Sequence, residues 1–250
     1  MRFFVEFAYN GTHFHGSQRQ LDAASVQETM EQAFTTILRQ TVNLTFAGRT
    51  DAGVHAEQMF AHFDLNNHIP SNLQTFTNSL NSLLPTDIAV KRIFHVDEQL
   101  HARFSALERT YEYRVTTRKN PFRQNLVTRV PPGLNYEAMN NAAQLLLGTH
   151  DFTSFCKVHT DVKTTLCTVT RADWTTSNTA TTSNGDAVFT ISADRFLRNM
   201  VRAVVGTLLE VGRGKMTVEH FQNIINAHNR CAAGQSAPPY GLFLTHIRYA

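Results

Sequence analysis

Alternation of apolar and polar residues predicts a regular order of strands and helices in the first part of the chain. Residues 2–8 alternate as a strand does, and Ser25 stands three residues before Glu28, the spacing of a capping box that opens a helix reaching Arg39. The same reading predicts strands at 42–46, 59–65 and 88–96 and a helix at 70–84. This β-α-β-β-α-β order predicts a ferredoxin-like split fold over residues 1–103.

The rest of the chain repeats this theme. The predicted elements are a strand at 104–116, a helix at 136–147, strands at 163–175 and 186–194 joined by a polar hairpin connection, helices at 195–211 and 217–227, and a strand at 241–249. We therefore expect an α+β fold with two ferredoxin-like (RRM-like) halves, residues 1–103 and 104–250, and a mixed, mostly antiparallel central sheet. The active site is expected in the cleft between the halves.

Composition and charge narrow the class of protein. With 42 % hydrophobic and 17 % charged residues among 250, the chain is too apolar to be disordered or fibrous. The net charge of +3 divides unevenly, into −4 for residues 1–102 and +7 for residues 103–250. This asymmetry favours an anionic partner, above all a nucleic acid, although uneven solvated faces would produce it too.

The cysteines and the apolar segments indicate the compartment. Three cysteines with no C-x-x-C pair argue against a disulfide framework and a cysteine zinc site. No membrane span or export signal is predicted, because residues 1–7 alternate and the apolar stretch 201–211 contains charged residues. A reducing, cytoplasmic location is expected.

The densest chemical cluster is the glycine-bearing loop AGRTDAGVHA at residues 47–56. Arg49 puts a fixed cation two residues from the Asp51 carboxylate, which could hold Asp51 ionised inside a closed site. A plain turn with a surface ion pair is the alternative.

A second cluster lies in the strand predicted after residue 103. Arg109, Tyr111 and Tyr113 would share one face, where two aromatic rings and a cation could clamp a base. Residues 103–129 hold seven basic and two acidic residues, the densest positive stretch of the chain. An ordinary half-buried strand would show the same alternation.

A third cluster falls on the helix predicted at 195–211. Arg195, Arg198 and Arg202 would lie within one narrow arc of this helix, opposite its apolar side. Three arginines so placed repel one another unless anions lie along them, but solvated arginines on an amphipathic helix remain the alternative.

Taken together, these motifs resemble those of the TruA-type tRNA pseudouridine synthases. The loop at 47–56 resembles the family signature, and six further motifs stand in the family's order. They are GSQRQ at 16–20, HARFSA at 101–106, RTYEY at 109–113, DFTSF at 151–155, RNMVRAVVG at 198–206 and APPYGLFL at 237–244. One departure is Ser17, where the family usually carries a large aromatic residue.

The resemblance implies a role for several residues. Asp51 would be the catalytic carboxylate, Tyr111 the tyrosine against the target base and Arg202 the arginine paired with Asp51. Leu242 would line the same pocket. Arg49 and Arg103 would hold the RNA and its flipped-out nucleotide, and the clusters add further candidates for substrate binding: Arg109, Tyr113, Arg195 and Arg198.

The resemblance also implies the reaction. The enzyme would isomerise uridine to pseudouridine in the anticodon stem-loop of tRNAs, at about positions 38 to 40, as a homodimer that reads tRNA by shape. Because the reaction leaves the atoms and the oxidation level unchanged, it needs no metal, redox cofactor or nucleotide. Attack on the sugar, attack on the base and removal of a ribose proton all stay open for Asp51. A non-catalytic tRNA-binding protein and a glycoside or nucleoside hydrolase are the alternatives from other classes.

Overall fold

The backbone of the protein groups into two compact units, seen here in a computed structural model. The structure describes residues 1–21, 23–66, 70–157, 164–179 and 182–250. Unit 1 comprises residues 1–107 and 243–250, and unit 2 comprises residues 108–242. The assignment of a separate role to residues 1–103 and 104–250 stays a prediction.

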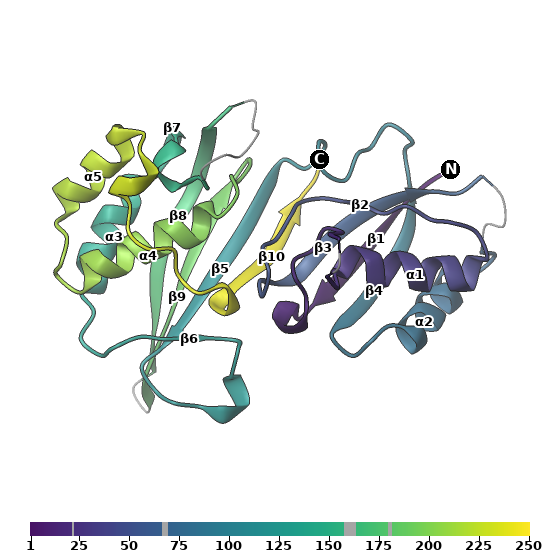
Figure 1. Cartoon of the computed structure of the whole chain (residues 1–250), viewed down its shortest axis with the longest axis horizontal. Coiled ribbons are helices and arrows are strands. Elements are labelled where there is room, and N and C mark those ends of the chain that lie inside the picture. The colour runs from purple at the N-terminus through teal and green to yellow at the C-terminus, as the bar shows by residue number, and fades with distance from the viewer. Residues whose placement is uncertain (22, 67–69, 158–163, 180–181) are drawn as a thin grey trace. The chain divides into compact units, whose positions relative to one another are not determined.

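Unit 1 has the β-α-β-β-α-β order that the sequence predicts. Its elements are β1 (Arg2–Tyr9), the short 3-10 turn η1 (Gly11–His13), α1 (Val26–Leu38), β2 (Thr45–Phe46), β3 (His55–Asp64), α2 (Leu73–Leu83) and β4 (Ile88–Val96), and most of β10 (Leu242–Arg248) joins them. The sheet order is β4-β1-β3-β10, with β2 also paired to β3. Strand β1 is antiparallel to β3 and β4, whereas β10 runs parallel to β3. Helices α1 and α2 lie side by side on one face of this sheet (Figure 1).

The core of unit 1 is aromatic on both faces of β1. On the helix side, Phe34 of α1 packs edge-on against Phe63 of β3 and Phe76 of α2, with ring centroids 5.1 and 5.5 Å away. On the other face, Phe4 and Tyr249 pack edge to face at 5.4 Å. The predicted helix start at Ser25 is confirmed, because the Ser25 side chain caps α1 by accepting a hydrogen bond from the Glu28 amide at 3.2 Å.

Unit 2 packs its helices on a mostly antiparallel set of strands. Its strands are β5 (Glu108–Thr116), β6 (Thr128–Arg129), β7 (Gly148–Asp151), β8 (Leu166–Thr179) and β9 (Thr182–Ala193), and its helices are α3 (Tyr136–Gln144), α4 (Met200–Gly212) and α5 (Val218–Ala227). Four strands follow the order β5-β9-β8-β7, and β6 pairs in parallel with β5. The α+β class with a mixed, mostly antiparallel sheet is thus confirmed.

Several predicted boundaries are wrong. Strand β5 begins at Glu108 rather than at residue 104. Strand β8 ends at Thr179 rather than at residue 175, and β9 begins at Thr182 rather than at residue 186. The predicted start of β8 at residue 163 lies outside the described residues.

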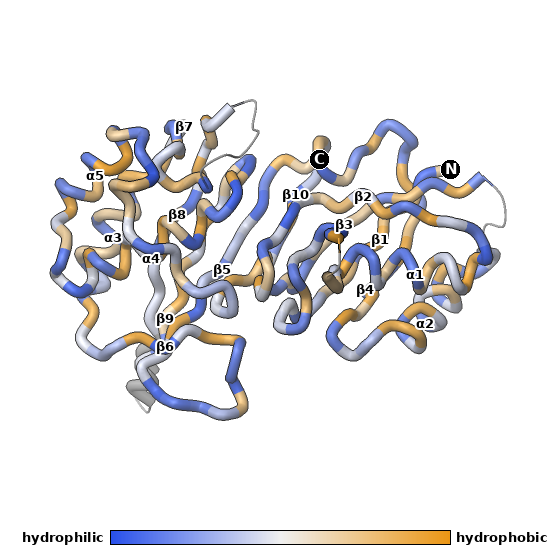
Figure 2. Tube along the Cα trace, in the orientation of Figure 1, coloured by the Kyte–Doolittle hydropathy of each residue, from blue (hydrophilic) through white to orange (hydrophobic). Residues whose placement is uncertain are grey.

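The helix predicted at 195–211 begins only at Met200. Asn199 adopts a left-handed conformation with φ of 65°, which breaks the helical path just before α4. Leu197 and Met200 are both buried. The apolar residues before Met200 thus keep the spacing of a helix although they lie outside α4. Hydropathy alone therefore placed the start of the helix too early. Figure 2 shows the hydrophobic colouring of α4, which is buried along most of its length.

Gly206 of α4 gives a prediction in which packing outweighs helix propensity. An added Cβ would lie 1.8 Å from the carbonyl oxygen of Gln235, so the segment above the helix must shift. We expect Gly206→Ala to lower the free energy of unfolding by about 1–3 kcal/mol, although alanine is the better helix former. Urea unfolding measures this, with Gly48→Ala as the control, because no atom lies within 4 Å of a Cβ added at Gly48. Equal or greater stability of Gly206→Ala would contradict the packing argument.

Candidate active site

The candidate catalytic carboxylate, Asp51, stands in the loop that joins β2 to β3 in unit 1. The Ala47 amide donates to the Phe60 carbonyl at 2.8 Å where the loop leaves β2, and the Val54 amide donates to the Asp51 carbonyl at 3.1 Å. Gly53 has φ of 77°, a conformation that glycine adopts without strain. The loop therefore turns sharply at Asp51, whose side chain is partly exposed.

Thr50, the residue before Asp51, is held by three buried contacts. Its amide donates to Ser17 Oγ at 2.8 Å, and its carbonyl accepts from the Ser17 amide at 3.2 Å. Its hydroxyl shares a hydrogen bond of 2.8 Å with the hydroxyl of Tyr9 from β1. Ser17 is only 1 % exposed. The small polar side chain of Ser17 thus helps to fix the loop that carries Asp51.

The loop is also fixed from its other end. A Cβ added at Gly11 would lie 2.0 Å from the Val54 carbonyl oxygen, so only glycine allows this approach. The Gly11 amide donates to Nδ1 of His55 at 3.0 Å, and the His55 ring stacks on Phe243 with centroids 4.5 Å apart. The segment before α1 therefore packs directly against the candidate catalytic loop.

Two of the predicted RNA-binding arginines meet at one hollow in unit 1. A cavity of about 170 Å³ is lined by both Arg49 and Arg103, together with Ser17, Gln27 and Phe46 among others. Arg49 follows Gly48 in the Asp51 loop, and Arg103 comes from the turn after β4; both are exposed. The structure thus places two cations, separated by more than fifty residues of sequence, around one depression beside the loop.

Two histidines shape the turn that carries Arg103. Nδ1 of His62 accepts from the Ala102 amide at 3.1 Å, and Nδ1 of His101 accepts from the amides of Arg103 and Phe104 at 3.1 and 3.3 Å. The two imidazole rings pack against each other with centroids 4.6 Å apart. These hydrogen bonds need an unprotonated Nδ1 on each ring.

In unit 2, the predicted site residues Arg202 and Tyr113 both hydrogen-bond to the backbone of residues 237–238. Arg202, in the first turn of α4, donates from Nε to the Ala237 carbonyl at 2.8 Å, and the Ala237 amide donates to the Arg202 carbonyl at 2.9 Å. The hydroxyl of Tyr113 donates to the neighbouring Pro238 carbonyl at 2.9 Å and shares a hydrogen bond of 2.6 Å with Thr128. Burial raises the pKa of Tyr113 well above its usual value.

Tyr113 and Tyr111 differ in their surroundings although they share a face of β5. Tyr113 is 0 % exposed, so its observed role is structural and contact with a substrate stays a prediction. Tyr111 is 8 % exposed and packs edge-on against Phe196, with ring centroids 5.1 Å apart. Leu242 is also buried.

The prediction that Arg195, Arg198 and Arg202 lie along one arc of a helix is wrong. Only Arg202 belongs to α4, because Arg195 and Arg198 precede the helix. Arg109 donates from Nη1 to the Asp194 carbonyl at 2.7 Å, which brings it to the turn that carries Arg195. Arg198 is exposed, and its carbonyl accepts from the Lys157 amide at 3.0 Å. The substrate contacts of these arginines stay predictions.

Within the described ranges, no three His, Cys, Asp or Glu side chains gather in a way that could hold a metal ion. No helix among these residues is both long enough and apolar enough to cross a membrane.

Comparison with known families defines the class of protein. The sequence model of the tRNA pseudouridine synthase family matches residues 7–105 and 142–250, which include Asp51 and Arg202. The chain belongs to the tRNA pseudouridine synthase family. Its predicted enzyme class, an isomerase, is confirmed.

Curated relatives carry a more particular name, tRNA pseudouridine synthase A. The protein of that name from Bacteroides thetaiotaomicron is 52 % identical over 248 residues, covering 99 % of this chain and 90 % of the relative. The one from Parabacteroides distasonis is 51 % identical, covering 99 % and 96 %. The one from Bacillus subtilis is 38 % identical, covering 100 % and 99 %.

Ser17 gives a prediction about the loop. Ser17→Ala leaves the buried amide of Thr50 without its acceptor, which costs about 1–3 kcal/mol of stability. We expect a lower urea midpoint and slower pseudouridine formation, because Asp51 follows Thr50 directly. Gln18→Ala, at the exposed neighbouring side chain, serves as the control for stability. An unchanged midpoint for Ser17→Ala would show that the contact does not stabilise the loop.

His62 gives a prediction about pH. Burial, together with the charges of Arg2 and His101, lowers the pKa of His62 from 6.5 to about 4. The unfolded chain takes up this proton near pH 6.5 and the folded chain only near pH 4, so stability falls as the pH falls through this window. We expect His62 to account for a loss of about 1–3 kcal/mol between pH 7 and pH 4.

Urea unfolding across this pH range measures the effect. His62→Gln keeps a hydrogen-bond acceptor but takes up no proton, so its stability should depend less on pH than that of the wild type. His220→Gln, at an exposed position of α5, is the matched control. Identical pH profiles for wild type and His62→Gln would refute the assignment.

Proposed function

We propose that this protein isomerises uridine to pseudouridine in the anticodon stem-loop of tRNAs, with Asp51 as the catalytic carboxylate. Membership of the family and the name that its relatives carry, tRNA pseudouridine synthase A, support tRNA as the substrate. One observation supports the assignment of Asp51 above all. Asp51 lies in a sharply turned loop, and the residue before it, Thr50, is fixed by buried contacts to Ser17 and Tyr9.

The reaction needs a positioned carboxylate. The bond between N1 and C1′ breaks, the base turns, and C5 bonds to C1′; C5 then loses its proton and N1 gains one. In this proposal Asp51 begins the reaction by attacking the sugar or the base or by taking a ribose proton. Each route requires an ionised carboxylate in a site shielded from water, which a nearby cation stabilises.

Tyr111 and Arg202 complete the proposed catalytic group. The cation would be Arg202, whose guanidinium Nε is already oriented by the Ala237 carbonyl. Tyr111, packed against Phe196, would stack on the base and move the C5 proton. Because both belong to unit 2, the proposal requires them to meet Asp51 of unit 1 in the working enzyme. Leu242 would add an apolar wall to that pocket.

Binding of the RNA would rely on cations around a flipped nucleotide. A uridine stacked within an RNA stem is out of reach, so the enzyme must turn it out and hold the neighbouring phosphates. Arg49 and Arg103, which line one cavity beside the Asp51 loop, are the proposed contacts in unit 1. In unit 2 the proposed contacts are Arg109, Tyr113, Arg195 and Arg198. A homodimer working in the cytoplasm is part of the same proposal.

Asp51→Asn tests the proposal directly. The amide has nearly the same shape but no negative charge, so we expect pseudouridine formation to fall by at least about a thousandfold while tRNA binding stays within about threefold. Chemical mapping of pseudouridine on a tRNA transcript measures the product at each uridine.

Asp97→Asn, at an exposed aspartate of the same unit, is the matched control and should keep full activity. Undiminished product from Asp51→Asn would reject the catalytic role of Asp51. Tight tRNA binding by the wild type without any product would instead identify a non-catalytic tRNA-binding protein, and release of free uracil would identify a hydrolase.

A further inference from the structure

The loop that joins β5 to β6, residues 117–127, carries an exposed aromatic side chain. Phe122 is 91 % exposed, whereas most phenylalanines of the described chain are buried. It lies in the short 3-10 turn η2 (Pro121–Arg123). The loop projects from the end of the sheet where β5 ends (Figure 1), and most of it is hydrophilic (Figure 2). A single exposed apolar residue is unremarkable by itself, so its setting decides what it indicates.

The loop holds Phe122 in a defined place. The side chain of Asn120 accepts from the Phe122 amide at 2.9 Å, and its carbonyl accepts from the Arg123 amide at 3.2 Å. Arg123 forms an ion pair with Asp186 of β9. At the base of the loop, the Thr117 amide donates to the Gly185 carbonyl at 3.1 Å. These bonds fix the backbone from which the exposed Phe122 ring projects, so that backbone loses little conformational entropy when the ring binds a flat partner.

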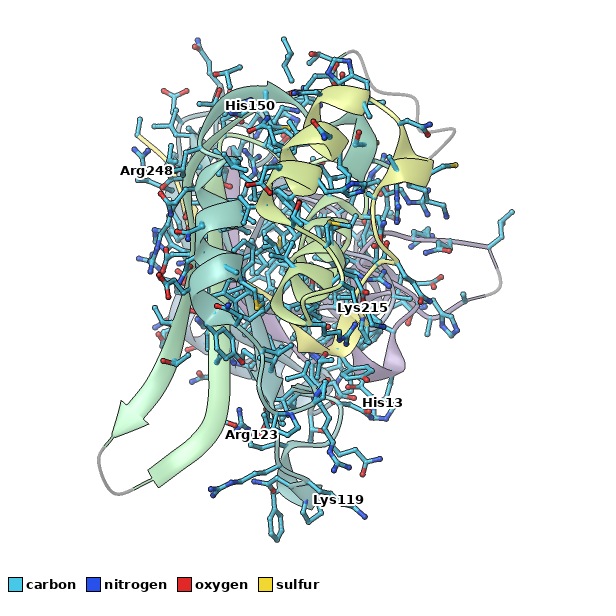
Figure 3. All side chains as sticks on the ribbon, turned by 90° about the vertical axis from the view of Figure 1, so that its left-hand side faces the viewer. His13, Lys119, Arg123, His150, Lys215 and Arg248 are labelled. Atoms are coloured by element: carbon cyan, nitrogen blue, oxygen red, sulfur yellow. The ribbon has the colours of Figure 1, made fainter. Side chains whose placement is uncertain are left out.

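The charge around Phe122 is entirely positive in sequence. Residues 113–136 contain five basic residues and no acidic one. Arg118, Lys119 and Arg129 are exposed around the loop, and Arg123 forms an ion pair with Asp186. Figure 3 shows Lys119 and Arg123 near one end of unit 2 and His150 near the other. The loop therefore combines an exposed aromatic ring with exposed cations, the two components of a surface that binds single-stranded nucleic acid.

We propose that this loop is a second RNA-binding surface, on which Phe122 stacks against an unpaired base while Arg118, Lys119 and Arg129 contact the flanking phosphates. The inference rests on the proposed function, because it takes RNA to be the substrate. RNA suits the surface better than a lipid bilayer, since one aromatic ring and one proline offer too little apolar area for membrane insertion. The excess of basic residues over residues 113–136 likewise favours a polyanion over a second copy of this loop.

Variants of the whole chain test this proposal. Phe122→Ala should weaken the binding of a tRNA transcript by about 5- to 100-fold, the range expected for loss of one base stack. It should change the binding of a fully paired RNA duplex by less than about twofold, because paired bases offer no free face. Leu83→Ala, which truncates a half-exposed leucine at the end of α2, should bind both RNAs as the wild type does.

Phe122→Trp reports on stacking directly. The only tryptophan of the chain, Trp174, is buried, so the substituted side chain supplies the exposed fluorescence. We expect tRNA to quench this fluorescence by more than half and the paired duplex to leave it nearly unchanged. Combining Phe122→Trp with Asp51→Asn should preserve the quenching, because the contact does not depend on the chemistry. The double variant Arg118→Ala, Lys119→Ala should reduce the salt dependence of tRNA binding.

The outcomes separate the two proposals. Quenching by tRNA with no pseudouridine from the wild type would reject the proposed function and keep the RNA contact. Normal product and tRNA affinity in Phe122→Ala, without quenching in Phe122→Trp, would overturn the RNA contact and keep the function. The proposed RNA contact would also be overturned if Phe122→Ala changed the oligomeric state or vesicle binding while tRNA affinity stayed the same.

Discussion

Three hydrogen bonds on Thr50 decide whether the rest of the candidate site can work. A carboxylate that must reach one atom of a nucleotide has to be placed to within a fraction of an ångström, and a loop gains such order only from its supports. Here the support is polar and buried: Ser17 binds both the amide and the carbonyl of Thr50, and Tyr9 binds its hydroxyl. Each of these partners would be left unpaired away from water if the loop moved.

The same principle recurs at the arginines. Arg202 is oriented by the Ala237 carbonyl, and the turn that carries Arg103 is held by the ring nitrogens of His62 and His101. In each case a long, flexible cationic side chain starts from a backbone fixed by local hydrogen bonds, which lowers the entropy lost when it meets a phosphate or a carboxylate. Much of the candidate site therefore consists of hydrogen bonds that fix the backbone, and only a few side chains are candidates for the chemistry itself.

Hydropathy and spacing predicted the strand and helix order of unit 1, the Ser25 cap and the α+β class, because these follow from local periodicity. They failed where a single residue overrides periodicity, as the left-handed Asn199 does at the start of α4. Motifs located Asp51 and its loop. They could not reveal that Ser17 holds Thr50 by hydrogen bonds or that Tyr113 is buried. Nor could they reveal that Arg49 and Arg103 line one cavity. Such facts depend on contacts between residues far apart in sequence.

The position of β10 has a consequence for the order of events during synthesis. Phe243 and Leu244 pair with His55 and Ala56 beside the Asp51 loop, so a strand made almost two hundred residues later completes the sheet of unit 1. While the ribosome makes the intervening residues, that edge of β3 stays uncovered by its native neighbour. Contacts between residues so far apart in sequence slow folding, and until they form, the edge of β3 presents unpaired backbone N–H and C=O groups. The sheet of unit 1 can therefore reach its native pairing beside the Asp51 loop only after β10 has been made.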